Sequence, residues 1–508
     1  MASVANAVNV NPDGLGQVLL YPYYTARGGN DTLISIVNTT ERGKAVKIRF
    51  IEALNSREVL DFNIYMSPYD VWTAAVTATA DGGGKMVTSD STCTAPYFYD
   101  AEAGFGERAF LDFEYAGDGG PQGIERTASG YIEVIEMHTM LPQSASSDDP
   151  TNPGYVPFAS KHVSGLPRDC QTLVNYWAPG FAFDIWNQGS VDFGFDTDLG
   201  ATGGLFGAGS VINVSEGTMF SYNATTVDGF WVQGDSFHTN PASLEPDLGS
   251  GTNNVSNVFV NGDVVTHDWT GAPSVAALNA TLTYDELMNE YSINEDLGGR
   301  SEWVLTFPTK RFHADANGGY TAANDPIPPF TRTWHIRADG SLNLPCEDIA
   351  FRVWDREETQ PTDPVGDVIV SPPPPPETPS IFQLCREANV VRFTTTGSLP
   401  DESEIMKEPL RADYPRLSYV NFQLPGYTDG WVQYDLTTVP GASPVAALGP
   451  RRSEPGENVD TGVFERVEGL PVIGFWANTF TNGDVAGTLA NYGGSFDHRG
   501  SRSVVASD

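Results

Sequence analysis

The sequence predicts an all-β protein of two or three antiparallel β-sandwich units, with long loops and one or two short helices. The first observation behind this prediction is alternation: Val46, Ile48 and Phe50 are separated by Lys47 and Arg49. A period of two puts each set of side chains on its own face of a sheet. The second is composition, because 52 glycines, 36 prolines and only 18% charged residues suit a loop-rich β protein better than a helical one.

The first sandwich is expected to begin with five short apolar runs within residues 17–76. Gly28 and Gly29 separate two of these runs, and glycine tolerates the positive φ that a hairpin turn requires. Residues 77–92 are polar and indicate a loop. Further strands are predicted at Ala109–Tyr115 and Gly130–Met140.

The middle of the chain mixes strand and helix signals. Asp169 is placed to cap a short helix that ends near Trp177. Thr283 to Glu286 has the spacing of a capping box and predicts a second helix, to about Ser292. Asn261-Gly262 predicts the turn of a hairpin over Val258–Val265, and Gly229–Val232 is expected to be a strand.

Changes in composition divide the chain into five predicted regions. They are an extended segment at 1–16, a sandwich at 17–150, a β-rich region with short helices at 151–356, a proline-rich loop or spacer at 357–380, and a β-rich region at 381–508. The run Pro372–Pro376 favours polyproline II, and residues 493–508 are expected to fray.

The charge of the chain limits its partners. A net charge of −37, from 65 acidic and 28 basic residues, repels nucleic acid and anionic membranes. No run approaches the roughly 18 apolar residues of a membrane helix. Ala5-Asn6-Ala7 has the form of a signal-peptidase site, from which we hypothesise that an export signal ends here; an ordinary alanine-rich start is the alternative.

The four cysteines fit an exported protein with two disulfides, because an even count without a Cys-x-x-Cys pair argues against zinc or redox motifs. Three connectivities exist. We favour Cys93 with Cys170 and Cys346 with Cys385, because these are neighbours in sequence; four buried thiols are the alternative. A Cys346–Cys385 bond would make the proline-rich segment a closed loop on one domain.

Two pairs of strands resemble a loose group of uncharacterised exported bacterial surface proteins with Ig-like β-sandwiches. The first pair is LISIVNTT…KAVKIRFIEA…SREVLDFNIYMSPYDVW; the second is GWVQYDL and GLPVIGFWA, at Gly430–Leu436 and Gly469–Ala477. The resemblance covers about a quarter of the chain. It implies an exported sandwich and carries over no catalytic residues.

Candidate catalytic groups are scattered. Glu136 and His138 stand two apart on a predicted strand and could form an acid/base or metal-binding pair, although solvation of a strand end is the plainer explanation. His267 is unlikely to be held by Asp268, since adjacent strand residues face opposite ways. The run from Ser495 to His498 is too local for a triad.

Calcium is the metal that the sequence favours, although simple Asp-rich turns remain the plainer explanation. Asp192, Asp196 and Asp198 alternate, and Asp315 and Asn317 begin a loop like those that bind calcium but without its last carboxylate. No other cofactor is indicated. Six tryptophans lie in or beside predicted strands, where they fill a core or, if exposed, stack on sugars: Trp72, Trp231, Trp303, Trp334, Trp431 and Trp476.

These observations predict a non-catalytic protein, secreted or at the cell surface, with a structural or assembly role. The extended segment Val8–Leu20 could add to the sheet of a neighbouring copy and so build an oligomer or filament. A calcium-assisted glycan-binding module is one alternative and predicts exposed Trp or Tyr beside clustered Asp. A secreted hydrolase is the other and predicts a deep pocket with converging carboxylates or histidines.

Overall fold

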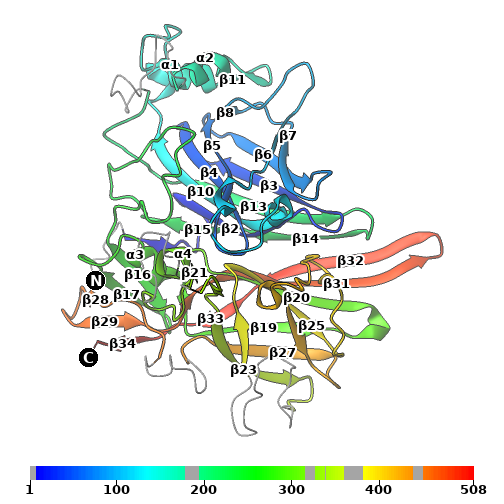
Figure 1. Ribbon diagram of the computed structural model, residues 1–508. Helices are drawn as coiled ribbons and strands as arrows, with labels where there is room; N and C mark the ends of the chain where they lie inside the picture. The colour runs from blue at the N-terminus through cyan, green and yellow to red at the C-terminus, as the bar shows by residue number, and fades with distance from the viewer. Residues whose placement is uncertain are drawn as a thin grey trace.

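The computed structural model describes residues 7–177, 194–314, 326–337, 339–359, 381–438 and 450–507. Strands dominate these residues, and nearly all neighbouring strands run antiparallel, which confirms the predicted all-β class. Two sandwiches lie one above the other, and a smaller sheet lies beside the lower one (Figure 1). Within the described ranges no helix is long and apolar enough to cross a membrane.

The first sandwich pairs a seven-stranded sheet with a six-stranded sheet. In spatial order the seven-stranded sheet holds β1 (Asn9–Val10), β15 (Thr225–Asp228), β2 (Val18–Thr25), β10 (Ser129–Thr139), β4 (Lys44–Glu52), β5 (Glu58–Met66) and β8 (Cys93–Ala95). The six-stranded sheet holds β14 (Thr218–Asn223), β13 (Leu205–Asn213), β3 (Asn30–Asn38), β6 (Val71–Ala78), β7 (Gly84–Thr88) and β9 (Gly106–Ala109).

Both faces of β4 are buried, although alternation predicted a half-buried strand. Val46, Ile48 and Phe50 face the core as expected. The opposite face carries Lys47 and Arg49, which are also fully covered. Their charges are matched there, because Lys47 donates to the carboxylate of Asp61 at 2.7 Å and Arg49 pairs with Glu58 and Glu133. Burial of a charge is tolerable only with such partners.

The second sandwich consists of a middle sheet, which faces the first sandwich, and an outer sheet. The middle sheet holds β26 (Val420–Gln423), β25 (Ala388–Thr394), β20 (Gly299–Thr306), β31 (Ile473–Val485) and β32 (Thr488–Asp497). The outer sheet holds β24 (Ile381–Leu384), β23 (Glu347–Asp355), β27 (Asp429–Asp435), β19 (Glu286–Ser292) and β33 (Arg499–Ser501). Trp303, Phe393 and Tyr434 pack between the two sheets.

A smaller side sheet packs on a fully buried helix, α3 (Ala276–Leu282). Its strands are β16 (Val255–Val260), β17 (Asp263–Asp268), β28 (Gly456–Asn458), β29 (Phe464–Val467) and β34 (Val504–Ala506). The remaining short elements are α1 (Tyr155–Ser160), α2 (Cys170–Asn175), α4 (Arg311–Ala314), β11 (His162–Val163), β12 (Leu166–Pro167), β18 (Thr283–Tyr284), β30 (Leu470–Pro471), β21 (His335–Ile336), β22 (Leu342–Asn343) and the 3-10 turns η1 (Phe113–Tyr115), η2 (Ile124–Ala128), η3 (Gln143–Ala145), η4 (Glu295–Leu297) and η6 (Pro415–Leu417).

The sheets do not follow the predicted regions. β13, β14 and β15 come from the predicted middle region but complete the first sandwich, while β19, β20 and β23 from the same region build the second. Strand pairing between residues far apart in the chain cannot be read from local composition, and here it crosses the boundaries predicted at residues 150 and 356. The extended segment is also paired within its own chain: Asn9 and Val10 lie opposite Asp228 and Val227.

Several local predictions were wrong. The capping-box pattern at Thr283 opens β18 and β19 rather than a helix, since Leu287 and Tyr291 are needed in the core of the second sandwich. Residues 77–92 contain β7. The predicted strands at 109–115 and 229–232 are mostly irregular, and residues 493–507 form β-structure rather than fraying.

Other local predictions are confirmed. Asp169 caps α2 by accepting a hydrogen bond from the backbone of Thr172. Asn261 and Gly262 turn between β16 and β17 with positive φ. The preferred cysteine pairing is also present, Cys93 with Cys170 and Cys346 with Cys385. The second bond and the pairing of β23 with β24 make residues 357–380 a connection within the outer sheet; the predicted polyproline run Pro372–Pro376 lies outside the described residues.

The middle sheet seals the lower end of the first sandwich. Val304, Val390 and Phe475 point upward and join the core of the first sandwich. The rings of Tyr222 on β14 and Phe475 on β31 stack with their centres 4.8 Å apart. One face of the middle sheet therefore belongs to the core of the first sandwich, and its other face belongs to the separate core of the second.

A buried carboxylate, Glu408, fastens the same junction. It lies on the loop after β25, is fully buried, and pairs with Arg386 at 2.9 Å. The hydroxyl of Tyr23, on β2, donates to it at 2.5 Å. Burial alone would raise the pKa of Glu408, but Arg386 and Arg27 outweigh burial and hold that pKa well below its usual range.

We expect Glu408→Gln to lower the free energy of unfolding at pH 7 by about 3–5 kcal/mol, because it leaves Arg386 buried without a countercharge. The pKa of Glu408 is lower in the folded protein than in the unfolded chain. Its carboxylate therefore stabilises the fold at pH values above the unfolded-state pKa, and this contribution to the free energy of unfolding falls as the pH drops below about 4.5. The difference in the free energy of unfolding between the wild type and Glu408→Gln should therefore shrink in acid. Urea unfolding of both proteins, at pH 7 and again well below about pH 4.5, measures this difference.

Glu404→Gln is the matched control, because Glu404 lies on the same loop and pairs with Arg392 but its side chain is 30% exposed. A partly exposed pair contributes about 1 kcal/mol or less. Equal losses in the two variants would contradict a special role for Glu408.

Candidate functional site

Two of the five predicted calcium ligands lie in the described part of the chain, and they do not form a site. The carboxylate of Asp196 pairs with the guanidinium of Arg42, and Asp198 is exposed on a turn. Asp192, Asp315 and Asn317 lie outside the described residues. Across the described ranges no three acidic, histidine or cysteine side chains are placed to hold a metal ion.

The predicted acid/base pairs come apart in the fold. A β-bulge separates Glu136 from His138, so Glu136 binds the ammonium of Lys44 at 2.7 Å while His138 stacks on Phe195. His267 bonds to Glu465 across the side sheet rather than to Asp268, as alternation predicted.

The serine and histidine near the C-terminus also separate. Ser495 donates to the carbonyl of Ser221, whereas His498 bonds to the carbonyl of Val304 at 2.9 Å. The two side chains therefore serve different contacts of the junction, and they do not act on one another as a triad would require.

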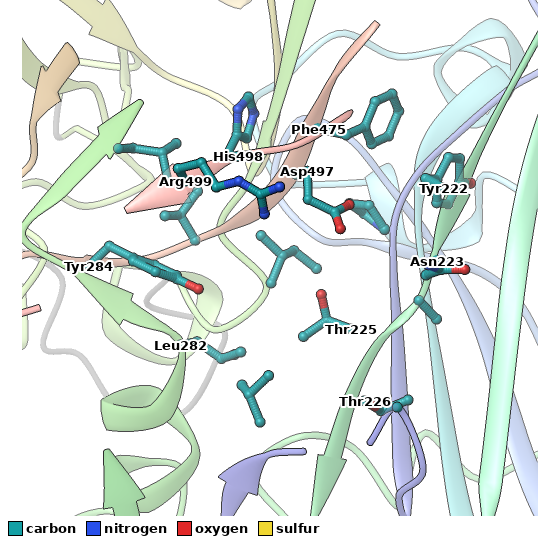
Figure 2. A pocket seen from close by; sticks show the side chains of 18 of the residues that line it. Tyr222, Asn223, Thr225, Thr226, Leu282, Tyr284, Phe475, Asp497, His498 and Arg499 are labelled. Atoms are coloured by element: carbon teal, nitrogen blue, oxygen red, sulfur yellow. The ribbon is translucent and has the colours of Figure 1, made fainter. Parts of the chain in front are cut away.

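A cavity of about 330 Å³ lies where the two sandwiches meet (Figure 2). Tyr222, Phe475 and Tyr284 contribute aromatic walls, and the side chains of Asp497 and Arg499 line it. Both charged residues are exposed, and neither has an ion-pair partner among the described residues. The cavity could hold a small polar molecule through this opposite-charge pair.

His498 lines the same cavity but is committed to the fold. Nε2 donates to the carbonyl of Val304, so Nδ1 is the nitrogen that accepts from the amide of Asn289, at 3.1 Å. Burial lowers the pKa of His498 to about 4, although the bond to Val304 acts in the opposite direction. A neutral ring with both nitrogens engaged is a structural group rather than a proton shuttle.

The lowered pKa of His498 predicts a loss of stability in acid. The unfolded chain takes up a proton near pH 6.5 while the folded ring stays neutral to about pH 4, so stability falls as the pH drops through this window, by at most about 3 kcal/mol from this group. His498→Gln keeps a donor for Val304 and does not titrate. We expect it to remove that part of the slope in urea unfolding between pH 7 and pH 4; an unchanged slope would contradict this assignment.

A second cavity, of about 350 Å³, opens beside β5. Its walls are mostly apolar and include Phe98, and its rim carries Leu111 and Phe113, which are 47% and 57% exposed. Burial and the neighbouring Glu58 raise the pKa of Asp61 to about 6 even though Lys47 opposes the shift. Two acidic residues, Asp61 and Glu58, are among the described residues that line this cavity. Because Glu58 is paired with Arg49, only Asp61 offers its carboxyl group to a ligand.

The outward face of the six-stranded sheet is uncharged over its centre. One row across the strands is formed by Ser221, Ser210, Leu33, Ala75 and Val87. The neighbouring rows hold Asn223, Ala208, Ser35 and Thr73, then Phe206, Val37 and Val71, and on the other side Met219 and Ile212. We refer to these residues as the uncharged face; Asp31, Lys85, Asp90 and Glu107 stand at its margin.

The apolar members of the uncharged face are open to solvent. Leu33, Val71, Phe206 and Met219 are 40–49% exposed. A sheet face in contact with water normally carries charged or strongly polar side chains. Sequence analysis missed this face, although the outward positions of β13, namely Phe206, Ala208, Ser210 and Ile212, carry the signal once the strand register is known.

Five of the six tryptophans singled out in the sequence are at most 5% exposed and fill cores or junctions. The exception is Trp431, which is 38% exposed on the outer sheet. These six tryptophans are thus mainly core residues, and Trp431 is the one among them that stands at the surface.

The chain matches no protein-family model, no curated protein and no solved structure. Its resemblance to exported surface sandwiches therefore stays a prediction.

Proposed function

We propose that this protein is a non-catalytic structural protein, exported to the cell surface or beyond, whose copies associate through the uncharged face. Two disulfides support an oxidising compartment outside the cytoplasm. The uncharged face is the observation that carries the assembly role. The segment Val8–Leu20 has no part in this proposal, because it is paired within its own chain.

The uncharged face suits a second copy of the same chain. With a net charge of −37, most surfaces of two copies repel one another, and contact costs least where charge is lacking. Flat sheets pack face to face about 10 Å apart with interlocking side chains. A contact of one face with the same face of another copy is isologous and follows a two-fold axis.

The size of the face predicts a weak contact. Five strands about 4.8 Å apart and seven residues of about 3.3 Å each cover roughly 500–600 Å². A stable complex buries about 800 Å² per partner, so this contact alone should be transient. Association should strengthen with salt, because ions screen the repulsion of the acidic surfaces while leaving apolar contact intact.

Analytical ultracentrifugation of the full chain at tens of micromolar tests the proposal. We expect concentration-dependent dimers or larger species, more of them in about 0.5 M than in about 0.02 M NaCl. Leu33→Glu places like charges opposite one another at the centre of the contact and should leave monomers.

Val264→Glu is the matched control, because Val264 is 48% exposed on β17 of the side sheet. It adds the same charge away from the uncharged face and should associate like the wild type. A wild-type chain that stays monomeric in high salt, or a Leu33→Glu variant that still associates, would refute the proposal.

A further inference from the structure

The outward face of the outer sheet, on the other sandwich from the uncharged face, carries a pair of tryptophans. Trp354 on β23 lies directly opposite Trp431 on β27, and their rings stack with centres 4.1 Å apart and planes within 9°. Trp431 is 38% exposed, whereas core tryptophans such as Trp303 are fully buried. The pair therefore offers an aromatic surface to solvent.

Polar side chains that bond to none of the described residues flank this pair. Glu290, on β19, lies opposite Trp431 on the far side from Trp354. One step along the sheet, about 7 Å away, Arg352 and Gln433 lie opposite each other. Within the described part of the chain, no hydrogen bond or ion pair engages the side-chain polar atoms of Glu290, Arg352 or Gln433.

The guanidinium of Arg352 is exposed and so within reach of a ligand. Acidic residues outnumber basic ones by 65 to 28, and buried cations such as Arg49 and Arg386 are matched by carboxylates. Arg352 is nevertheless exposed and without an acidic partner among the described residues. Its cross-strand neighbour Gln433 offers an amide, so two planar hydrogen-bonding groups lie side by side.

We propose that this surface binds a polysaccharide of pyranose units. The C–H face of a pyranose ring carries slight positive charge and stacks on the negative face of an aromatic ring. Paired hydroxyls of the same or the next unit match the planar donors and acceptors of Arg352, Gln433 and Glu290. Trp431, Arg352 and Glu290 are all exposed on this face, so a long chain can lie across it.

Nucleic acid, which would also stack on tryptophan, fits poorly because the acidic chain repels phosphates. A second copy of the chain is the competing occupant, and the sedimentation of Trp431→Ala distinguishes it from a polysaccharide. The inference is independent of the proposed self-association, which uses the other sandwich.

Native gels that contain hydroxyethylcellulose or alginate test the inference with the full chain. Hydroxyethylcellulose is a neutral pyranose polymer and alginate a uronate polymer, so the two arms distinguish the charge of the preferred sugar. We expect retardation in at least one gel. Trp431→Ala should weaken the apparent affinity about tenfold or more, and Arg352→Ala should act more strongly in alginate.

Tyr69→Ala is the matched control, because Tyr69 is an aromatic residue 67% exposed on the first sandwich, and it should migrate like the wild type. The side chain of Gln433 makes no hydrogen bond or ion pair with the described residues, so Gln433→Ala should leave the urea unfolding curve unchanged, and a loss of binding would then come from the surface itself. Retardation in neither gel, or equal retardation of the wild type, Trp431→Ala and Gln433→Ala, would overturn the inference. So would a change of sedimentation in Trp431→Ala, which would assign the face to a second copy.

Discussion

The stability of this fold depends on how the second sandwich closes the first. The middle sheet acts as a shared layer: Trp303 faces the outer sheet, while Phe475 on the neighbouring strand faces the first sandwich. Neither sandwich would bury its apolar surface alone. Glu408 adds direction to this contact, because its carboxylate accepts from Tyr23 of the first sandwich only when the two sandwiches are in register, while Arg386, just before β25 of the second sandwich, supplies the countercharge. Apolar burial supplies most of the free energy, and the ionic contact selects one arrangement.

Contacts between segments far apart in the chain also explain the buried charges of β4. Lys47 and Arg49 alternate with core residues, and taken alone they indicate a face in contact with water. Segments far away in the chain cover that face and bring Glu133 and the carbonyls of residues 240–243 to the charges. A strand pattern therefore reports which side chains share a face, but not whether a distant segment will cover it.

The same reasoning separates what the sequence predicts from what it does not. The five strands β2 to β6, the cap at Asp169 and the disulfides follow from local signals: alternation, a short polar side chain and cysteine count. The helix predicted at Thr283 failed because the core needs Leu287 and Tyr291 on one side of a strand, and tertiary packing outweighs a capping pattern. The uncharged face and the tryptophan pair depend on cross-strand register, which no single stretch contains. Both lie on outer layers, one on each sandwich, so self-contact and sugar binding could occur together.

The closed connection between β23 and β24 has a practical consequence. Pairing of residues 347–350 with residues 381–384 holds the two strands that it joins, and the Cys346–Cys385 bond closes the other end of this strand pair. Anchoring of this kind makes the sheet insensitive to how many residues the connection contains, since lengthening a closed loop costs little free energy. The position is suited to carry a grafted peptide or a fluorescent reporter on the assembled protein, and natural variation in chain length would be tolerated there for the same reason.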